Sequence, residues 1–444
     1  MELSRKRVLV LGLGMSGISA ANFCAARGAS VLAADEAPEE RLRDLGALST
    51  AVERSIGCPW PNPADFDLVV PSPGIPSERY ASRAKAVAGD IELAGQFLDI
   101  PIVAVTGTNG KSTTVSLVEA MLKSAGLRAK AAGNLGVPAL SLVGEPLDVA
   151  VLEVSSFQLE AIDTFRPTIA AVLNVTPDHL DRHGDFEGYC GAKARIFENQ
   201  TATDTAILNY DDAISRGLAL SCSARVIGFS RLGQVDVGAC LDSGAVLVRT
   251  PKGDQRISLD GLNLAGVQNL ENVLAAVAIV SALDVDPARA IAALHEFSGL
   301  PHRSEVVATI AGTTYVNDSK ATNPGAALGA IEGVDAPVIW IAGGRNKGLS
   351  FESLADTAAR RVKTAIFFGE SAAPLRAAVG ERIDVRCVDN LATAVREAAS
   401  IAAPGDVVLL APACTSLDQF RSFEHRGESF RSEVLALSQE SQQP

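Results

Sequence analysis

Residues 105–113 read Val-Thr-Gly-Thr-Asn-Gly-Lys-Ser-Thr and follow the apolar run Ile102–Val105. The two glycines let backbone N–H groups wrap around phosphate oxygens, Lys111 supplies a positive charge, and the hydroxyl of Ser112 suits Mg²⁺. The segment Thr114–Ser124 has the length and composition of a helix. A valine replaces the first glycine of the strict phosphate-loop pattern, but a merely structural turn would not need Gly-Lys-Ser-Thr at a helix start. We therefore predict a nucleoside triphosphate site on a strand–loop–helix unit.

The same alternation of apolar strands and helical segments recurs along the chain. Apolar runs of strand length are Val8–Leu11, Leu68–Val70, Ile102–Val105, Val149–Val154, Ile169–Leu173, Val338–Ala342, Ala365–Phe368 and Val407–Ala411. Continuous apolar strands separated by helices predict mostly parallel sheets covered on both faces. We expect an α/β fold of three domains, a Rossmann-like domain over 1–93, a central P-loop domain over 94–298 and a Rossmann-like domain over 299–444. Residues 230–262 alternate in character and predict a small antiparallel segment.

The composition excludes several classes of protein. The 444 residues are 47% hydrophobic and carry a formal charge of −13, so we expect a folded protein without a nucleic-acid partner. No uncharged apolar run reaches about 18 residues, so we expect no membrane span. Glycines interrupt the apolar run Val8–Leu11, which favours a buried strand over an export signal. Seven scattered cysteines without a C-x-x-C pair favour reduced thiols and a cytoplasmic protein.

A second glycine-rich loop, Gly12–Gly17, matches the pattern G-x-G-x-x-G after a strand. Asp35 follows at the end of the next apolar run, where a carboxylate can bind a ribose hydroxyl. Taken alone, this pattern favours an NAD-type site. The same loop can also hold another diphosphate or form a merely structural turn.

Polar residues follow two strands that run towards the edge of the phosphate loop. Glu153 lies near the end of the run Val149–Val154 and could reach a metal ion held by Ser112, although a lone glutamate is more often a surface charge. Residues Thr176–His183 hold two of the five histidines of the chain together with two aspartates. This segment suggests a metal site, and a structural histidine remains an equal alternative.

These motifs resemble the Mur ligase family, whose members build the peptide stem of bacterial cell-wall precursors. The resemblance rests on the segments Gly107–Thr113, Glu153–Leu159, Asp178–Arg182, Ser72–Ile75, Asn317–Asn323, Gly343–Gly348 and Pro412–Phe420, with Phe423 and Arg426-Gly427. It covers essentially the whole chain, and the later motifs narrow it to the D-glutamate-adding branch. The Asp-Asn-Pro-Arg motif of the diaminopimelate-adding branch is absent.

The resemblance implies an ATP-dependent ligase that adds D-glutamate to UDP-N-acetylmuramoyl-L-alanine through an acyl phosphate. The first domain would bind the UDP part of the precursor and the second would bind ATP. The third would close over both and bring D-glutamate. The implied cofactors are ATP, two Mg²⁺ ions and a CO₂-derived carbamate on Lys193. The partners would be these small molecules alone, and we expect a monomer.

The resemblance also implies roles for individual residues. The UDP-substrate site would contain Gly14, Met15, Ser16, Asp35, Gly74 and Asn134. The ATP site would contain Gly107, Thr108, Asn109, Gly110, Lys111, Ser112, Thr113, Asn269, Asn272, His302, Arg303 and Asp318. D-Glutamate would bind to Thr322, Lys347, Ser416 and Phe423. The metal ligands would be Ser112, Glu153, His179 and Lys193, and the catalytic residues Lys111, His179 and Lys193.

Four positions and three alternatives stay open at this stage. Without the resemblance, Lys193 would be taken for an ordinary surface lysine. Glu36-Ala37 stands where Thr-Arg is expected, and Gln268 stands where His is expected. The alternatives are another amino-acid-adding Mur or folylpolyglutamate-type ligase, an NAD-dependent oxidoreductase, and a noncatalytic P-loop binding protein.

Overall fold

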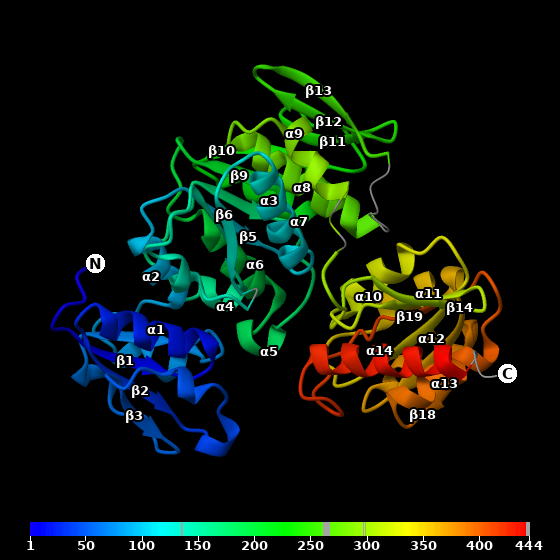
Figure 1. Ribbon diagram of the computed structural model, residues 1–444, viewed down its shortest axis with the longest axis horizontal. Coiled ribbons are helices and arrows are strands. Elements are labelled where there is room, and N and C mark those ends of the chain that lie inside the picture. Colours follow the sequence, from blue (N-terminus) through cyan, green and yellow to red (C-terminus); the bar gives the residue numbers. More distant parts are fainter. Residues whose placement is uncertain (135, 261–266, 296, 298, 441–444) are drawn as a thin grey trace. The chain divides into compact units, whose positions relative to one another are not determined.

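The computed structural model describes residues 1–134, 136–260, 267–295, 297 and 299–440 (Figure 1). The chain divides into two compact units, the first of which comprises Met1–Val175, Glu187–Asp260 and Asn272–Glu296. The second comprises Thr176–Phe186, the first residues of helix α8 and the chain from Phe297 onwards. Three sheets flanked by helices confirm the predicted α/β class, with two sheets in the first unit and one in the second. The domain boundaries near residues 94 and 299 stay predictions.

The first sheet is parallel and has the strand order β3-β2-β1-β4. Its elements are β1 Arg7–Leu11, α1 Met15–Ala26, β2 Ser30–Asp35, β3 Glu53–Ile56, β4 Leu68–Pro71 and α2 Asp90–Phe97. Because β1 lies between β2 and β4, the loop that follows β1 lies beside the ends of both neighbours. Ligands of α/β folds bind at such a point, where the strand order reverses.

The second sheet has the order β13-β12-β11-β10-β9-β8-β5-β7-β6. Its strands are β5 Ile102–Thr106, β6 Ala129–Gly133, β7 Val149–Glu153, β8 Ile169–Val172, β9 Thr205–Asn209, β10 Arg225–Ser230, β11 Gly238–Asp242, β12 Ala245–Thr250 and β13 Gly253–Ser258. Its helices are α3 Lys111–Ser124, α4 Ser156–Leu159, α6 Phe186–Ala194, α7 Ala213–Gly217, α8 Val267–Ala282 and α9 Pro287–Ile291. The predicted antiparallel segment is confirmed, since β12 runs antiparallel to both β11 and β13.

The sheet of the second unit has the order β14-β15-β19-β16-β17-β18, and only β14 and β15 pair antiparallel. Its strands are β14 Glu305–Ile310, β15 Thr313–Asn317, β16 Val338–Gly343, β17 Val362–Phe368, β18 Asp384–Val388 and β19 Val407–Leu410. The helices of this unit are α5 Leu180–His183, α10 Pro324–Glu332, α11 Ala355–Arg361, α12 Ala372–Val379, α13 Leu391–Ile401 and α14 Phe423–Glu440. The parallel strands β15, β19 and β16 are neighbours, so the loops that follow them gather at one edge of the sheet.

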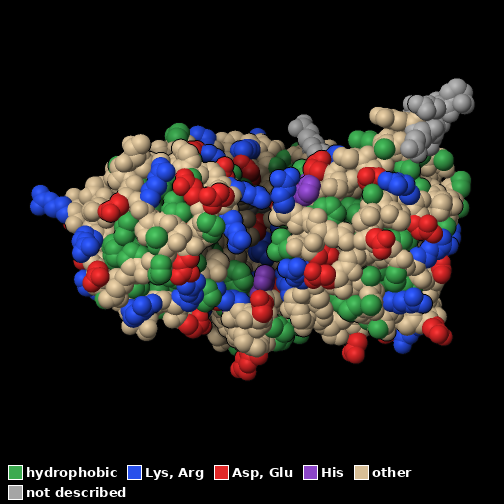
Figure 2. All heavy atoms as spheres, turned by 90° about the horizontal axis from the view of Figure 1, so that it is seen from below, with side chains coloured by type: hydrophobic (Ala, Val, Ile, Leu, Met, Phe, Trp, Pro, Cys, Tyr) green, Lys and Arg blue, Asp and Glu red, His purple; other side chains and the backbone are tan. Residues whose placement is uncertain are grey.

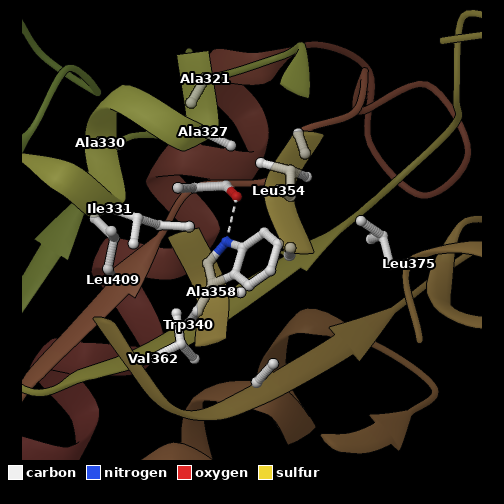
Figure 3. Close-up of a cluster of buried hydrophobic side chains, with 14 of the residues drawn as sticks. Ala321, Ala327, Ala330, Ile331, Trp340, Leu354, Ala358, Val362, Leu375 and Leu409 are labelled. Carbon is white, nitrogen blue, oxygen red and sulfur yellow. Dashed lines mark hydrogen bonds between the residues drawn. The ribbon is translucent and has the colours of Figure 1, made fainter. Parts of the chain in front are cut away.

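Trp340 on β16 fixes one of these loops from inside the core (Figure 3). Its ring is fully buried among side chains such as Ile331, Leu354 and Ala358. The indole Nε1 donates a hydrogen bond to the carbonyl of Ala411 at 2.8 Å, drawn as the dashed line in Figure 3. A buried indole N–H needs such a partner, so the apolar core also holds the backbone just before the loop that follows β19.

The surface and the helices agree with the composition. On the face shown in Figure 2, Lys and Arg side chains are interspersed with Asp and Glu. Within the described ranges, no helix combines the length and the apolar character that a membrane crossing requires. All seven cysteines are free thiols.

Candidate active site

The phosphate loop lies between β5 and α3, and two of its positions suit glycine alone. Gly107 has φ +155° and Gly110 has φ +86°. A Cβ atom on Gly110 would stand 2.3 Å from Oδ1 of Asn272, and one on Gly107 would stand 3.0 Å from Cβ of Leu173. The glycines therefore keep the backbone open in front of the first amides of α3, an arrangement that binds phosphate groups.

Asn174, which sequence reasoning missed, holds this loop in shape. Its carbonyl accepts a hydrogen bond from N of Thr108 at 2.9 Å, and its Oδ1 accepts one from N of Asn109 at 2.9 Å. Its side-chain amide donates back to the carbonyl of Asn109 at 3.2 Å. Asn174 follows β8, the neighbour of β5, so its place directly after an apolar run that leads towards the phosphate loop could have pointed to it.

Two lysines place their amino groups at the carbonyls of the loop. Lys111 Nζ donates to the oxygens of Gly107 and Thr108 at 2.7 and 2.9 Å. Lys193 Nζ donates to the same Gly107 oxygen at 2.8 Å and lies 4.6 Å from the ring centroid of Tyr189. The hydroxyl of Tyr189 lies 3.1 Å from Oγ1 of Thr108. Lys193 is only 1% exposed, so the alternative of a surface lysine is wrong.

Ser112 and Glu153 supply oxygen donors beside the loop. Both are buried, and Glu153 lies opposite Val105 in the register of β5 and β7. Oε1 of Glu153 accepts a hydrogen bond from Nδ2 of Asn134 at 2.7 Å, which brings a predicted substrate residue to a predicted metal ligand. Within the described part of the chain, no three His, Cys, Asp or Glu side chains gather as a metal site. Hard oxygen donors of this kind fit Mg²⁺, which usually completes its shell with water and substrate phosphate.

The predicted adenine-site asparagines lie on α8. Asn272 is buried, and its Oδ1 accepts a hydrogen bond from Oγ1 of Thr114 at 3.3 Å. Together with its approach to Gly110, this contact places Asn272 against the start of α3, which also carries the buried Thr113. Asn269 lies in the first turn of α8. The side chain of Gln268 lies outside what the structure describes.

In the first glycine loop, Asp35 binds backbone amides. Its Oδ2 accepts a hydrogen bond from N of Leu13 at 2.8 Å, and its Oδ1 accepts one from N of Ala37 at 2.9 Å. A Cβ atom on Gly14 would meet nothing within 4 Å, and the side chain of Met15 is 56% exposed. Asp35 therefore shapes the loop, and Gly14 and Met15 face space that a ligand can fill, whereas the hydroxyl of Ser16 hydrogen-bonds to the buried carboxyl group of Asp90.

The departure at Glu36 has its own local partner. Arg79 donates from Nη2 to both carboxylate oxygens of Glu36, at 2.9 and 2.8 Å, and its guanidinium carbon lies 3.9 Å from the ring centroid of Trp60. Gly74 is exposed on the segment that precedes Arg79. The acid at position 36 therefore belongs to a cluster with an arginine and a tryptophan.

In the second unit, Arg303 and Asp318 lie close together. Asp318 is buried and accepts a hydrogen bond from Oγ of Ser304 at 3.3 Å. Burial raises the pKa of Asp318 to about 6, although the charge of Arg303 and the hydroxyl of Ser304 oppose the shift. His302 instead packs inside this unit, with Nδ1 3.0 Å from Nδ2 of Asn317.

The four predicted D-glutamate residues come from the loops that gather at the edge of the third sheet. Thr322 follows β15, Lys347 follows β16, Ser416 follows β19, and Phe423 begins α14. Ser416 is buried, and its carbonyl accepts a hydrogen bond from N of Phe420 at 2.8 Å. The fold therefore brings one cation and several donors to one edge, where two carboxylates could bind.

Asp178 forms an ion pair with Lys347. Sequence reasoning did not predict this pair. Lys347 Nζ lies 2.9 Å from Oδ1 of Asp178, and Nδ2 of Asn323 donates to Oδ2 at 3.1 Å. Burial acts to raise the pKa of Asp178, but the charges of Lys347 and His179 and these hydrogen bonds lower it below its usual range. The segment Thr176–Phe186 thus belongs to the second unit, and the joint metal site of His179 and Lys193 stays a prediction.

The fold and the phosphate loop define a nucleotide-binding α/β protein, and comparison with known families makes the class specific. Residues 105–280 match the Mur ligase middle domain, and residues 302–414 match the family described as Mur ligase, glutamate ligase domain. Residues 6–95 match the family described as Mur ligase MurD-like, N-terminal domain. The chain belongs to the Mur ligase family.

Individual relatives agree with this assignment. The UDP-N-acetylmuramoylalanine--D-glutamate ligase of Pelotomaculum thermopropionicum is 43% identical, over 98% of this chain and 99% of its own. The protein of the same name from Koribacter versatilis is 42% identical, over 99% of each chain. A pseudomurein peptide ligase type C from Methanothermus fervidus shares the fold with a TM-score of 0.65 at 16% identity, over 98% of this chain and all of its own.

Proposed function

We propose that this chain joins D-glutamate to the carboxyl group of UDP-N-acetylmuramoyl-L-alanine at the expense of ATP. The observation that carries the proposal is the open phosphate loop of Gly107 and Gly110, with Lys111 and the buried Ser112 and Glu153 beside it. The names of relatives about 40% identical over the full chain support the choice of substrates. These relatives favour a ligase over the oxidoreductase and the noncatalytic binding protein.

The chemistry explains why a phosphate loop serves peptide-bond formation. A carboxylate is a poor electrophile, because its carbon is electron-rich and oxide is a poor leaving group. Transfer of the γ-phosphoryl group of ATP to the substrate carboxylate gives an acyl phosphate and ADP. The D-glutamate amine then attacks the acyl carbon, and phosphate leaves as the peptide bond forms. Positioning and charge neutralisation dominate such transfers.

The loop residues have distinct tasks in this scheme. Lys111 exchanges its bonds to the carbonyls of Gly107 and Thr108 for phosphate oxygens when ATP binds. The backbone amides that begin α3 hold the same phosphates, and Asn174 keeps the loop in its binding shape. Ser112 and Glu153 would hold Mg²⁺, which when bound supplies charge neutralisation to the phosphates.

The hydrogen bond that Lys193 makes is compatible with the proposed carbamate. A carbamylated lysine keeps one hydrogen on Nζ, and that hydrogen can maintain the present bond to Gly107. The two new oxygens would replace a buried positive charge by an anion beside the phosphate loop. Metal and carbamate would then stabilise each other in a partly desolvated pocket.

D-Glutamate is proposed to bind at the loops that carry Thr322, Lys347 and Ser416, with Phe423 at the start of α14. The two carboxylates of D-glutamate require at least one cation, and Lys347 is the cation among the four residues. Binding therefore redirects Lys347 from Asp178 towards the substrate. Because Asp178 forms an ion pair with Lys347, Asp178 also influences how Lys347 binds D-glutamate.

The decisive experiment measures phosphate release from ATP with UDP-N-acetylmuramoyl-L-alanine, with and without D-glutamate. We expect sustained release and a new peptide product only when all three substrates are present. A panel of amino acids, including L-lysine, diaminopimelate and L-glutamate, separates this proposal from other ligases of the family. Preference for another amino acid, or binding of NADH with hydride transfer, would overturn the proposal.

A further inference from the structure

Arg426 connects the three loops that carry the proposed D-glutamate residues. Its Nε donates to Oγ of Ser319 at 3.0 Å, and its Nη2 donates to the carbonyls of Ser319 at 2.9 Å and Cys414 at 3.2 Å. Its Nη1 donates to the carbonyl of Gly343 at 3.2 Å. Ser319 follows β15, Gly343 ends β16, and Cys414 follows β19. The side chain of Arg426 thus forms hydrogen bonds to all three of these segments.

The backbone is shaped to admit this side chain. Gly344 has φ +129°, and a Cβ atom there would stand 3.1 Å from Nη1 of Arg426 and 2.0 Å from the carbonyl oxygen of Thr415. The hydroxyl of Ser319, which accepts from Arg426, donates in turn to the carbonyl of Phe423 at 2.8 Å. The contacts of Arg426 therefore also reach the first residue of α14.

The burial of Arg426 is energetically unfavourable, which argues against a purely structural role. Its side chain is 0% exposed, and within the described part of the chain all its hydrogen-bond acceptors are neutral oxygens. Burying a cation without a hydrogen-bonded carboxylate is costly. Arg426 also lies in the first turn of α14, where the helix dipole favours anions over cations. Burial lowers its pKa to about 10, with Cys414 and Asp418 opposing the shift, so the group is still charged at neutral pH.

We propose that Arg426 is a positioning residue for the amino-acid substrate. The planar guanidinium group of Arg426 holds Ser319, Gly343 and Cys414 in one arrangement. In this arrangement Thr322, Lys347 and Ser416 present their hydrogen-bond donors together. The buried charge of Arg426, whose hydrogen-bond acceptors in the described residues are all neutral, favours the two anionic groups of D-glutamate at this edge. The inference rests on the proposed function and extends it to a residue that does not itself touch the substrate.

The test separates the two half-reactions. Arg426→Lys keeps the charge but loses the fork, and Arg426→Met loses both. We expect the D-glutamate KM to rise about tenfold or more in the first and further in the second, since charge-assisted hydrogen bonds are lost. Formation of the acyl phosphate, trapped by borohydride reduction without D-glutamate, is expected to stay within threefold of wild type, as is the ATP KM. A merely structural role would lower both half-reactions together.

Two further variants keep the test decisive. Ser319→Ala removes only the acceptor of Nε and the link to Phe423, so it should raise the D-glutamate KM in the same direction but less, even if Arg426→Met folds poorly. Arg396→Met is the matched control, because Arg396 is an exposed arginine of the same unit, 3.6 Å from Glu433, and its KM values should not change. Unchanged D-glutamate KM values in all Arg426 and Ser319 variants, or equal losses in both half-reactions, would overturn the inference. A wild-type enzyme that rejects D-glutamate would instead overturn the proposed function.

Discussion

Lys111 lies at the phosphate loop, where its Nζ bonds to the carbonyls of Gly107 and Thr108. Lys111→Ala removes the charge that would face the phosphates, and we expect kcat to fall by about 10²–10³-fold or more. Steady-state phosphate release at saturating ATP and Mg²⁺ measures the loss. Lys123→Ala on the same helix alters an exposed pair with Glu119 and should leave the rate unchanged. Near-normal turnover of Lys111→Ala would contradict the assignment of the loop.

Lys193 offers a sharper test, because its proposed chemistry changes the sign of its charge. Lys193→Ala should lose most activity without unfolding, and acetate that diffuses into the vacated space should restore part of it. Lys193→Arg should stay inactive, since a guanidinium keeps its charge and cannot ligate a metal. A ¹³C NMR spectrum recorded with labelled bicarbonate should show a carbamate resonance in wild type that both variants lack. An arginine variant with wild-type activity would show that a plain cation suffices.

Asp318 is expected to reduce the stability of the ligand-free protein at neutral pH. Because its pKa is raised from 3.8 to about 6, the folded state binds the proton more tightly and loses stability as the pH rises through that interval. Asp318→Asn should therefore increase the free energy of unfolding by up to about 3 kcal/mol at pH 7.5, and by progressively less towards pH 4. Calorimetry at both pH values measures the difference, with the exposed Asp335→Asn as control. An increase in the free energy of unfolding that does not depend on pH would contradict this account. The ligation activity of Asp318→Asn should fall whether or not the increase depends on pH.

The residue scale is also where sequence reasoning was least complete. The glycines, Lys111 and Ser112 form a contiguous pattern whose geometry follows from local chemistry. Asn174 and Asp178 act through hydrogen bonds to residues far away in the chain. Asn174 carries no local signature, and the motif that contains Asp178 does not reveal its pairing with Lys347. The burial of Lys193 depends on the packing of α6 against the phosphate loop, so sequence alone favoured the wrong alternative.

At the scale of elements, helix α2 is attached to the loop after α4 through one carboxylate. Glu92 is buried and accepts hydrogen bonds from the backbone N–H groups of Asp163, Thr164 and Phe165 and from the hydroxyl of Thr164 at 2.6 Å. Although burial acts to raise its pKa, these bonds and one from Gln96 hold the pKa of Glu92 below its usual value. The carboxylate therefore stabilises the fold at neutral pH, and the contribution disappears as the pH falls through its folded-state pKa.

Glu92→Gln tests this attachment with little change of shape. The new amide group would turn N–H donors towards backbone N–H donors, so we expect a loss of about 2–4 kcal/mol in the free energy of unfolding. Urea unfolding at pH 7.5 measures the loss. The control Glu119→Gln removes an exposed pair on α3 and should cost less than about 0.5 kcal/mol. Equal effects of the two substitutions would show that Glu92 does not hold α2.

Strands and helices were the most predictable level of this structure. Buried parallel strands read as continuous apolar runs, so β1, β5, β16 and β19 were found close to their observed bounds. The alternating residues after 230 indicated the antiparallel strands β11–β13. The assignment of Thr176–Phe186 to the second unit was missed, because it depends on side-chain contacts such as that between Asp178 and Lys347.

At the scale of the whole molecule, the phosphate loop and the proposed amino-acid site fall into different compact units. Substitutions in one site should therefore change the kinetic constants of one substrate. Lys347→Ala should raise the D-glutamate KM by at least about tenfold, because it removes the cation proposed for the carboxylates. The ATP KM should change by less than twofold, and Arg382→Ala, at an exposed pair with Asp356, should change neither. If the ATP KM rises instead, Lys347 belongs to the nucleotide site.

The position of α14 has a consequence for the synthesis of the protein in the cell. The phosphate loop is complete once the first 280 or so residues have left the ribosome, whereas Phe423 and Arg426 come more than a hundred residues later. A nascent chain, or one clipped before α14, would hold an intact nucleotide loop, but its amino-acid loops would lack the hydrogen bonds from Arg426. Such a chain could bind ATP but not join the amino acid, so the order of translation itself delays ligation until the last helix has folded.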